Sequence, residues 1–289
     1  MNYSLLFSLA MFLLLTAWNA VAEEQDSVQL EGEQPVISII IDDMGHQLKV
    51  GNKALELQGA VTYAFLPHTP YAREMAEQAH AVGKEVMLHL PMDARDGQPL
   101  GPGGLSLHMT EQRFQDTLAS SLASVPHVAG INNHMGSLLT RHPGAMGWLM
   151  QGLQQRSDLF FVDSRTTSLT VAQKLAREHQ IPSAGRDVFL DNIREPEYIR
   201  EQFQQLIRRA KIRGKAIGIG HPYPETIATL REELEKLDES GVKLVFTSEI
   251  IATERRNIPW QASLSPSPKA VKNSKPSLSS TCCEEPELK

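Results

Sequence analysis

The amino-acid sequence predicts an α/β protein, a single domain built as a distorted (β/α) barrel of about seven to eight parallel strands. Short apolar runs alternate with longer segments of helical periodicity, which is typical of a parallel sheet covered by helices. Almost every apolar run ends in polar residues capable of chemistry. Such residues are expected at the carboxyl edge of parallel strands, where ligands bind.

The predicted strands are short apolar runs bounded by turn-forming residues. They are Val36–Ile41, Ala60–Leu66, Glu85–Leu90, Val128–Asn132, Leu159–Val162, Ser183–Leu190, Ala216–Gly220 and Leu244–Ser248. The helices predicted between them are Tyr71–Ala81, Thr110–Ser121, Gly144–Gln155, Leu169–His179, Glu197–Ile212 and Glu225–Glu239. An open doubly wound sheet is the alternative, but it would need a Gly-rich phosphate loop after the first strand. The segment Ile41-Asp42-Asp43-Met44-Gly45 is not such a loop.

The N-terminal end of the chain predicts export. Leu5–Trp18 is an uncharged apolar run, shorter than the about 20 residues that span a bilayer, and Ala20-Val21-Ala22 fits a signal-peptidase site. We therefore expect residues 1–22 to be a cleaved signal peptide, with an uncleaved anchor as the alternative. Residues 23–34 are expected to be an acidic disordered leader. The mature protein is expected to be periplasmic or secreted, without stable membrane insertion.

The barrel domain is predicted to span residues 35–258, followed by a disordered tail rich in Ser, Pro and Lys at residues 259–289. The domain contains 24 Lys and Arg residues against 26 Asp and Glu residues, a net charge of −2. This balance excludes a nucleic-acid-binding class, because no basic field is available to bind phosphates. Cys282 and Cys283 lie in the tail, so the domain is expected to fold without disulfides.

Three histidines at strand ends, His89, His134 and His221, are predicted to converge on the paired carboxylates of Asp42 and Asp43. Neutral imidazoles with one carboxylate form a good site for a divalent metal, with Zn²⁺ the expected ion and one position left for water. A single Asp at a strand end more often caps the next helix. Asp191, Asn192 and Glu249 are interpreted in that way.

The two adjacent aspartates, Asp42 and Asp43, are expected to have different functions in the site. Side chains of adjacent residues point to opposite sides of an extended strand, but a bend after the strand lets one aspartate bind metal while the other holds the attacking water. Like charges this close raise one pKa unless a cation compensates for them. Arg165 and Arg186, both at strand ends, are the candidates for that role.

Five segments at these positions resemble the divergent polysaccharide deacetylase family, across roughly Pro35 to Ile251. They are Ile41-Asp42-Asp43-Met44-Gly45, Leu88-His89-Leu90-Pro91-Met92, Asn132-Asn133-His134-Met135-Gly136-Ser137, Val162-Asp163-Ser164-Arg165 and Gly220-His221-Pro222. This family is related to the NodB-type carbohydrate esterases, which remove N- or O-acetyl groups from polysaccharides on a distorted (β/α) barrel. The resemblance therefore implies the same fold and a glycan substrate.

The resemblance also implies roles for the acidic pair and its neighbours. In the relatives, the first Asp of the pair is the general base and the second is a metal ligand, which corresponds to Asp42 and Asp43. Two further ligands come from an HxxxH motif, and here the matching segment reads His89-x-x-x-Asp93. Because the second His is replaced, His134 is the preferred third ligand and Asp93 the second choice.

A late-strand histidine that acts as general acid in the relatives matches His221, whereas their Arg-Pro-Pro motif has no convincing counterpart here. The metal would activate water and polarise the acyl carbonyl. Asp42 would take the proton of the water, and protonated His221 would give one to the departing amine or alcohol. Further candidate site residues are Asp93, Asp163, Arg165, Arg186 and Asp187.

Three functions remain compatible with these residues. The first is a metal-dependent hydrolase that deacetylates an envelope or extracellular glycan. The second is a non-catalytic glycan- or envelope-binding protein on a degenerate deacetylase scaffold, which the altered HxxxH motif favours. The third is another metal hydrolase such as a phosphoesterase, because an Asp/His site does not identify its substrate.

Overall fold

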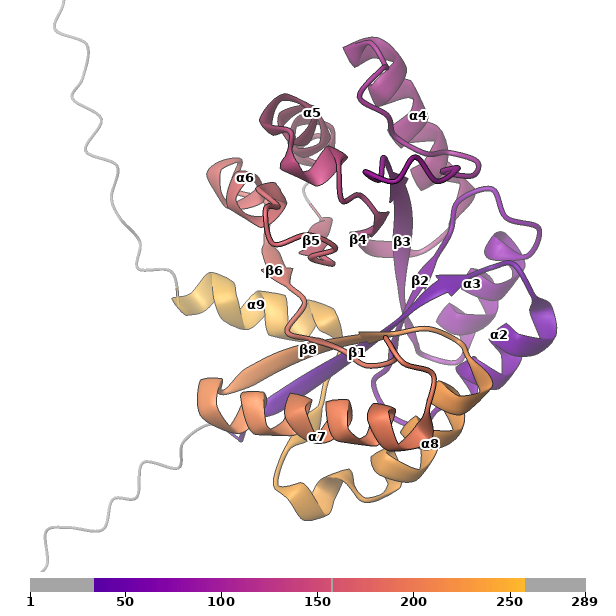
Figure 1. Cartoon of the computed structure of the whole chain (residues 1–289), viewed down its shortest axis with the longest axis vertical. Helices are drawn as coiled ribbons and strands as arrows, with labels where there is room; N and C mark the ends of the chain where they lie inside the picture. The colour runs from indigo at the N-terminus through magenta and orange to yellow at the C-terminus, as the bar shows by residue number, and fades with distance from the viewer. Residues whose placement is uncertain (1–33, 157, 258–289) are drawn as a thin grey trace, which may run out of the picture. The chain divides into compact units, whose positions relative to one another are not determined.

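Parallel strands form one curled sheet in the computed structural model, which describes residues 34–156 and 158–257 (Figure 1). The strands are β1 (Val36–Met44), β2 (Thr62–Phe65), β3 (Glu85–Met92), β4 (Val128–Met135), β5 (Phe160–Asp163), β6 (Ser183–Gly185), β7 (Val188–Phe189), β8 (Lys215–Gly220) and β9 (Lys243–Leu244). Their order is β6-β5-β4-β3-β2-β1-β8-β7, with β9 beside the start of β1. The predicted distorted (β/α) barrel is confirmed.

The two ends of the sheet are joined by a single dipeptide. β6 pairs with β5 and β7 pairs with β8, and only Arg186 and Asp187 lie between β6 and β7. The Arg186 N–H donates to the carbonyl of Asp163 at the end of β5 (2.9 Å), whereas the Asp187 N–H donates to the carbonyl of Ile217 in β8 (2.8 Å). The predicted strand Ser183–Leu190 therefore changes partners midway, and this step is the distortion of the barrel.

Helices connect the strands and cover the outside of the curled sheet (Figure 1). They are α2 (Leu48–Leu55), α3 (Ala72–Ala81), α4 (Glu111–Ser124), α5 (Pro143–Gln154), α6 (Ala172–Glu178), α7 (Pro196–Arg213), α8 (Pro224–Glu235) and α9 (Thr247–Asn257), with 3₁₀ turns at Leu139–Arg141 and Leu237–Ser240. None of the helices in the described ranges is long and apolar enough to cross a bilayer. The predicted signal peptide, the leader up to Glu33 and the tail lie outside these ranges.

Two predictions about the elements are wrong. The predicted strand Leu244–Ser248 ends at Leu244, and Thr247 begins α9, because the N–H groups of Thr247 and Ser248 are bonded by side chains of other strands as in a helix cap. The helix α2 was not expected from the sequence, since Gly51 and Asn52 are poor helix formers. The end of the Met75 side chain packs against Gly51, in the space that a Cβ at this position would take.

Alternation along the strands builds two apolar clusters. In β1, Ile37, Ile39 and Ile41 belong to the larger cluster, which contains the buried side chains of helices α3 to α8. Ile40 belongs to the smaller inner cluster, together with Ile250 and other buried residues of the sheet. Successive side chains of a strand point to opposite faces of the sheet. The inner cluster therefore fills the inside of the curl, and the residues that follow it along each strand face the same interior.

Candidate metal centre and active site

On the inner face of the sheet, polar residues that can take part in catalysis follow directly after the inner apolar cluster. Asp42, His89 and His221 each lie two residues after an apolar side chain of that cluster. Because the side-chain period of a strand is two, these three residues point into the interior from β1, β3 and the end of β8. Asp42 and His89 are only 2% exposed. The alternation of side chains along three strands therefore brings Asp42, His89 and His221 together in the interior.

Asp43 reaches the same place by a bend of the backbone. Its φ of 55° lies in the left-handed region, and the β1–β2 register shifts between Ile41 and Met44. Met135, directly after His134, has a φ of 52°. Such backbone in residues other than Gly costs about 1–3 kcal/mol and clusters at functional sites. The bend allows both members of the Asp42–Asp43 pair to face the interior.

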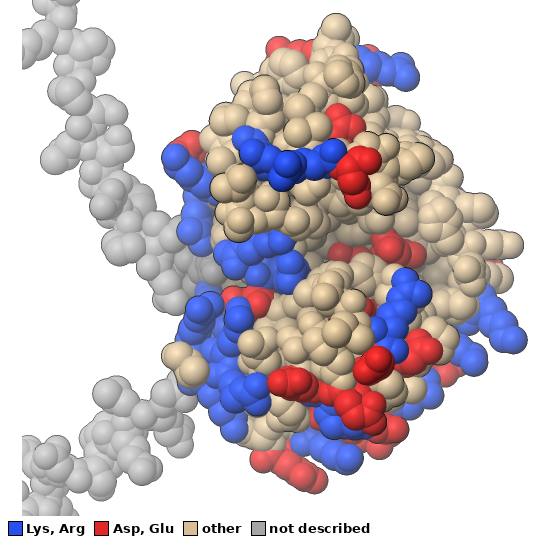
Figure 2. Space-filling model, viewed as in Figure 1, with Lys and Arg blue, Asp and Glu red and all other residues tan. Residues whose placement is uncertain are grey.

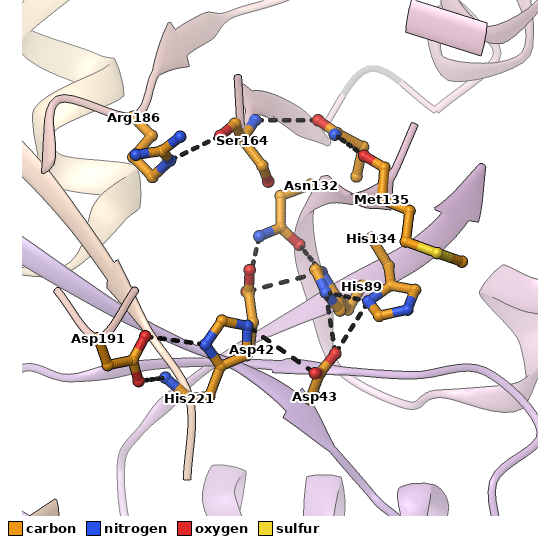
Figure 3. Close-up of polar contacts among 11 residues, drawn as sticks. Asp42, Asp43, His89, Asn132, His134, Met135, Ser164, Arg186, Asp191 and His221 are labelled. Carbon is orange, nitrogen blue, oxygen red and sulfur yellow. Dashed lines mark hydrogen bonds and ion pairs between the residues drawn. The ribbon is translucent and has the colours of Figure 1, made fainter. Parts of the chain in front are cut away.

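Asp43, His89 and His134 present three ligand atoms to one another (Figure 3). Asp43 Oδ1 lies 2.9 Å from His134 Nδ1 and 3.3 Å from His89 Nε2, and these two nitrogens are 3.0 Å apart. Tetrahedral zinc with bonds of ~2.0–2.1 Å would place its ligands about 3.3 Å apart. Asp43 Oδ1 is buried and has no hydrogen bond of acceptable geometry. The donor set and this unsatisfied oxygen fit a divalent cation.

Asn132 fixes the orientation of His89 and Asp42. Its Nδ2 donates to Asp42 Oδ1 (2.7 Å), so its Oδ1 is left to accept from His89 Nδ1–H (2.8 Å). Protonation of Nδ1 leaves the lone pair of His89 on Nε2, the atom that faces Asp43 and His134. No role was predicted for Asn132 from the sequence, although it stands two residues before His134 in a segment that carries the family resemblance.

Burial and neighbouring charges shift the pKa values of Asp42 and Asp43 in opposite directions. Burial raises the pKa of Asp42, although His89, His221 and the Asn132 amide act to lower it. Burial also acts to raise the pKa of Asp43, but its contacts with His134 and His89 outweigh that effect and hold it well below the usual range. Burial opposes protonation of His89, yet Asp42 and Asp43 raise its pKa to about 9. Asp43 is therefore the permanent anion of the pair.

Asp191 positions His221 (Figure 3). Its Oδ1 accepts from His221 Nδ1–H (3.0 Å), and its Oδ2 accepts from the His221 N–H (2.6 Å) and the Thr226 hydroxyl (2.8 Å). His221 Nε2 is therefore directed into the site, 3.8 Å from Asp43 Oδ2. Burial lowers the pKa of His221, but the hydrogen bond and charge of Asp191 outweigh this and raise it. The sequence pattern favours a helix cap at Asp191, and only the place of this residue two positions past a strand points to a role in the site.

Three candidate acids have their carboxylates engaged elsewhere. Asp93 Oδ2 accepts from the Leu107 N–H (2.8 Å). Asp163 accepts from the Arg165 N–H and the Thr170 hydroxyl, both at 2.8 Å, ahead of α6. The carboxylate of Asp187 accepts from the Ile217 N–H (2.9 Å) and pairs with Arg213 (3.1 Å). These carboxylates hold loops and the joint of the barrel, and the group of three metal-type ligands does not include them.

A cavity of about 590 Å³ opens beside the site. Asp42, His89, His134 and His221 line it together with Arg165, Arg186 and one face of α7. A second cavity, of about 430 Å³, lies on the Asp43 side against Tyr223 and Arg194. Figure 2 shows a hollow in this view of the molecule, with Lys and Arg side chains gathered along one side of it. A molecule larger than the reacting group can therefore approach the histidines and aspartates.

The fold and the residues at its carboxyl edge place the chain among proteins of the polysaccharide deacetylase type. Residues 39–251 match the model of the divergent polysaccharide deacetylase family, and the chain belongs to that family. It is 36% identical to an uncharacterized protein of Haemophilus influenzae over 222 residues, 77% of this chain and 79% of that protein. It is 37% identical to the uncharacterized protein YibQ of Escherichia coli over 215 residues, 74% of this chain and 67% of that protein.

A solved structure shares the fold. The crystal structure of an uncharacterized protein from Agrobacterium tumefaciens C58 superposes with a TM-score of 0.73 at 22% identity. The superposition covers 76% of this chain and 90% of that protein. At this level of identity, the likeness shows the fold alone.

Proposed function

We propose that the protein is a metal-dependent hydrolase that removes acetyl groups from a cell-envelope or extracellular glycan. The observation that carries this proposal is the placement of Asp42 and His221 around Asp43, His89 and His134. Four of these residues line one cavity, and Asp43 lines the second. A carboxylate and an imidazole beside a ligand set for a divalent cation are the groups that acyl-group hydrolysis requires. Membership of the deacetylase family supports a glycan as the substrate.

The residues of the chain have separate tasks in this reaction. Asp43, His89 and His134 would hold the ion, for which we propose Zn²⁺, and a bound ion lowers the pKa of water and polarises an acyl carbonyl. Asp42, held by Asn132, accepts the proton of the attacking water. That water forms the new C–O bond of acetate as the bond between the acyl carbon and the sugar nitrogen or oxygen breaks.

His221 completes the proton balance. Its Nδ1 is bonded to Asp191, so its Nε2 is the atom that delivers a proton to the departing amine or alcohol. Burial acts to lower the pKa of His221, but the hydrogen bond and the charge of Asp191 outweigh burial and raise it. This favours the protonated form that a general acid needs. Acetate and the free amine or hydroxyl of the glycan are the products.

Two measurements on protein purified without a His-tag test this function. Elemental analysis is expected to find about one equivalent of a divalent metal, as for a site with three protein ligands. A screen of acetylated oligosaccharides is expected to give acetate release that chelation abolishes and Zn²⁺ restores. A protein that holds no metal and releases no acetate would instead be a glycan-binding protein on a degenerate scaffold, as the altered HxxxH motif of His89 and Asp93 would then indicate.

We also propose that the protein acts outside the cytoplasm, on the basis of the apolar run and the Ala20-Val21-Ala22 segment at its N-terminus. The mature protein should begin at Glu23. Mass spectrometry of the periplasmic fraction measures this directly. A mass that retains Met1 and the apolar run would contradict cleavage.

A further inference from the structure

Two arginines at the joint of the barrel hold each other in place. Arg165 Nη1 donates to the carbonyl of Arg186 (3.0 Å), and Arg186 Nη2 donates to the carbonyl of Arg165 (3.0 Å). Arg186 also donates to the carbonyl of Ser164 (2.6 Å) and lies over the ring of Phe189 (4.9 Å). Gly185 leaves room for this arrangement, because a Cβ there would lie 2.4 Å from Arg165 Nε. Both residues line the same cavity as the candidate catalytic residues, and Arg165 also lines another cavity together with Gln173.

The positive charge of this pair is only partly balanced. Asp42 and Asp163 act on Arg186 through their charge, but within the ranges that the structure describes no carboxylate bonds either guanidinium group. The guanidinium hydrogen bonds of Arg165 and Arg186 go to backbone carbonyls and to the neutral amide of Gln173. The acids that line the cavity have other partners. Asp42 is bonded to Asn132, and Asp187 pairs with Arg213. The cavity therefore has one cationic wall with guanidinium hydrogens left to donate.

A buried hydroxyl supplies a second observation at the same wall. Ser164 is 5% exposed and lines the cavity, and its Oγ has no hydrogen-bond partner. A buried polar atom without a partner is costly, so such an atom commonly marks a place where a ligand bonds. Figure 3 shows the side chain of Ser164 between Arg186 and Asn132.

The face of α7 that lines the cavity is uncharged. Tyr198, Gln202 and Gln205 follow one another at helical spacing on α7, and all three line the cavity. Their amide and phenol groups can bond sugar hydroxyls without repelling an anion. A cationic wall with a free hydroxyl thus lies beside a neutral polar wall, in a space continuous with the catalytic residues.

We propose that this cavity binds an acidic group of the glycan, a carboxylate or a phosphate, through Arg165, Arg186 and the Ser164 hydroxyl. The inference rests on the proposed function only for the identity of the carrier, a glycan. Guanidinium groups form paired hydrogen bonds with either anion, and a serine hydroxyl can donate a further one. The protein would therefore prefer acidic glycans to neutral ones of the same length.

A matched set of ligands tests the preference without requiring turnover. An acetylated oligosaccharide that contains a uronic acid is titrated into the intact metal-loaded protein by calorimetry. The same oligosaccharide after reduction of its carboxyl group, and a phosphorylated counterpart, are titrated in parallel. The acidic ligands are expected to bind about 10- to 100-fold more tightly than the reduced one, as expected for hydrogen bonds to charged groups. The tighter of the two acidic ligands identifies which anion the subsite takes.

Three variants locate the effect. Arg165→Gln should remove most of the preference while leaving the affinity for the reduced ligand unchanged. Gly185→Ala should weaken acidic ligands by displacing Arg165 with its charge intact, and Ser164→Ala should weaken them less. Arg208→Gln is the matched control, since it removes one positive charge from an exposed position of α7 outside the cavity. Each variant is compared with wild type by thermal midpoint to establish that it folds.

The outcomes separate this inference from the proposed function. Equal binding of acidic and reduced ligands, or equal losses in Arg165→Gln and Arg208→Gln, would overturn the anion subsite even if acetate is released. Arg165-dependent preference for the acidic ligands, without acetate release from any substrate, would uphold the subsite and reject the deacetylase. If Arg165→Gln does not fold, Ser164→Ala and Gly185→Ala decide between these results.

Discussion

Two buried polar clusters at opposite edges of the barrel differ in how well their groups are satisfied. The amino-edge cluster consists of Ser38, Thr62, Glu85, Thr247 and Ser248. Ser38 Oγ and Thr247 Oγ1 are 2.7 Å apart, and the Thr62 hydroxyl donates to Glu85 Oε1 (2.9 Å). The N–H of Ser248, in the first turn of α9, lies 3.2 Å from the same oxygen. Each of these hydroxyls has a partner, so the cluster acts as a cap that fixes α9 beneath the barrel.

The carboxyl-edge cluster consists of Asp42, Asp43, His89, Asn132 and His134. It is equally buried at its centre, yet Asp43 Oδ1 has no hydrogen bond and both His89 and His134 direct nitrogens at it. Ser183 Oγ at the start of β6 also lacks a partner, but the unsatisfied atom at the carboxyl edge is a carboxylate oxygen faced by two histidine nitrogens, which a bound cation would satisfy. The comparison indicates that the amino edge contributes stability and the carboxyl edge contributes binding.

The largest expected effect is on metal content. Replacing Asp43, His89 or His134 with Ala should abolish stoichiometric metal binding and acetate release, because two protein ligands are too few to retain the ion. Elemental analysis after dialysis measures the metal, and circular dichroism measures the fold. His127→Ala is the matched control, since this surface histidine pairs with Glu77 (2.7 Å) away from the site. Full metal retention in the Asp43→Ala variant would contradict the assigned ligand set.

Asp42→Ala and His221→Ala should separate catalysis from metal binding. Both variants should keep the metal, because neither residue belongs to the group of three ligands. Turnover should fall by about 10²–10⁴, the usual contribution of a general base or acid. Single-turnover acetate release, normalised to bound metal, checks this. Loss of metal in either variant would mean that the residue is a ligand instead.

Changes at the amino edge should alter stability without altering metal content. Glu85→Ala should lower the free energy of unfolding by about 1–3 kcal/mol, because the Thr62 O–H and the Ser248 N–H lose the acceptor that the Glu85 carboxylate provides. Chemical denaturation measures the loss, with exposed Glu74→Ala as the control. A metal content below that of wild type would show that the two edges are coupled.

The pH dependence of the free energy of unfolding tests the stabilising role of Glu85 at the amino edge. Burial raises the pKa of Glu85, although bonds from Ser248 and Thr62 act to lower it. The folded state therefore binds the proton more tightly than the unfolded state, so this contribution is complete below the unfolded pKa of about 4.3 and is lost as pH rises through the folded pKa. Glu85→Gln cannot ionise and should lose less stability than wild type between acidic and neutral pH. Parallel curves would contradict this assignment.

The fold could be predicted from the sequence because the apolar pattern of a strand is a local property. The hydrogen bonds that orient the site residues join distant parts of the chain and could not be predicted in this way. Apolar runs that end in Asp42, His89 and His221 already place these residues at one edge of a parallel sheet. Asn132 and Asp191 act through bonds to residues 90 and 30 positions away, respectively, along the chain. Nothing in the neighbouring sequence of an Asn or Asp distinguishes such a long-range bond from a helix cap. The partner change of the strand between β6 and β7 is likewise a property of the closed sheet.

The smallest expected effect concerns Asp93, which stands where the related esterases have the second His of their HxxxH motif. Its Oδ2 accepts from the Leu107 N–H (2.8 Å), and its backbone bonds Leu105, Leu138 and Leu139. Its carboxylate therefore supports the loop at Leu107. His134 from the next strand occupies the position beside Asp43 and His89 that a third ligand requires. Asp93→Ala should keep full metal content and lower the thermal midpoint slightly, because only the bond to the Leu107 N–H is lost. Elemental analysis beside His134→Ala decides the matter: loss of metal from Asp93→Ala, with retention in His134→Ala, would return the third ligand to β3.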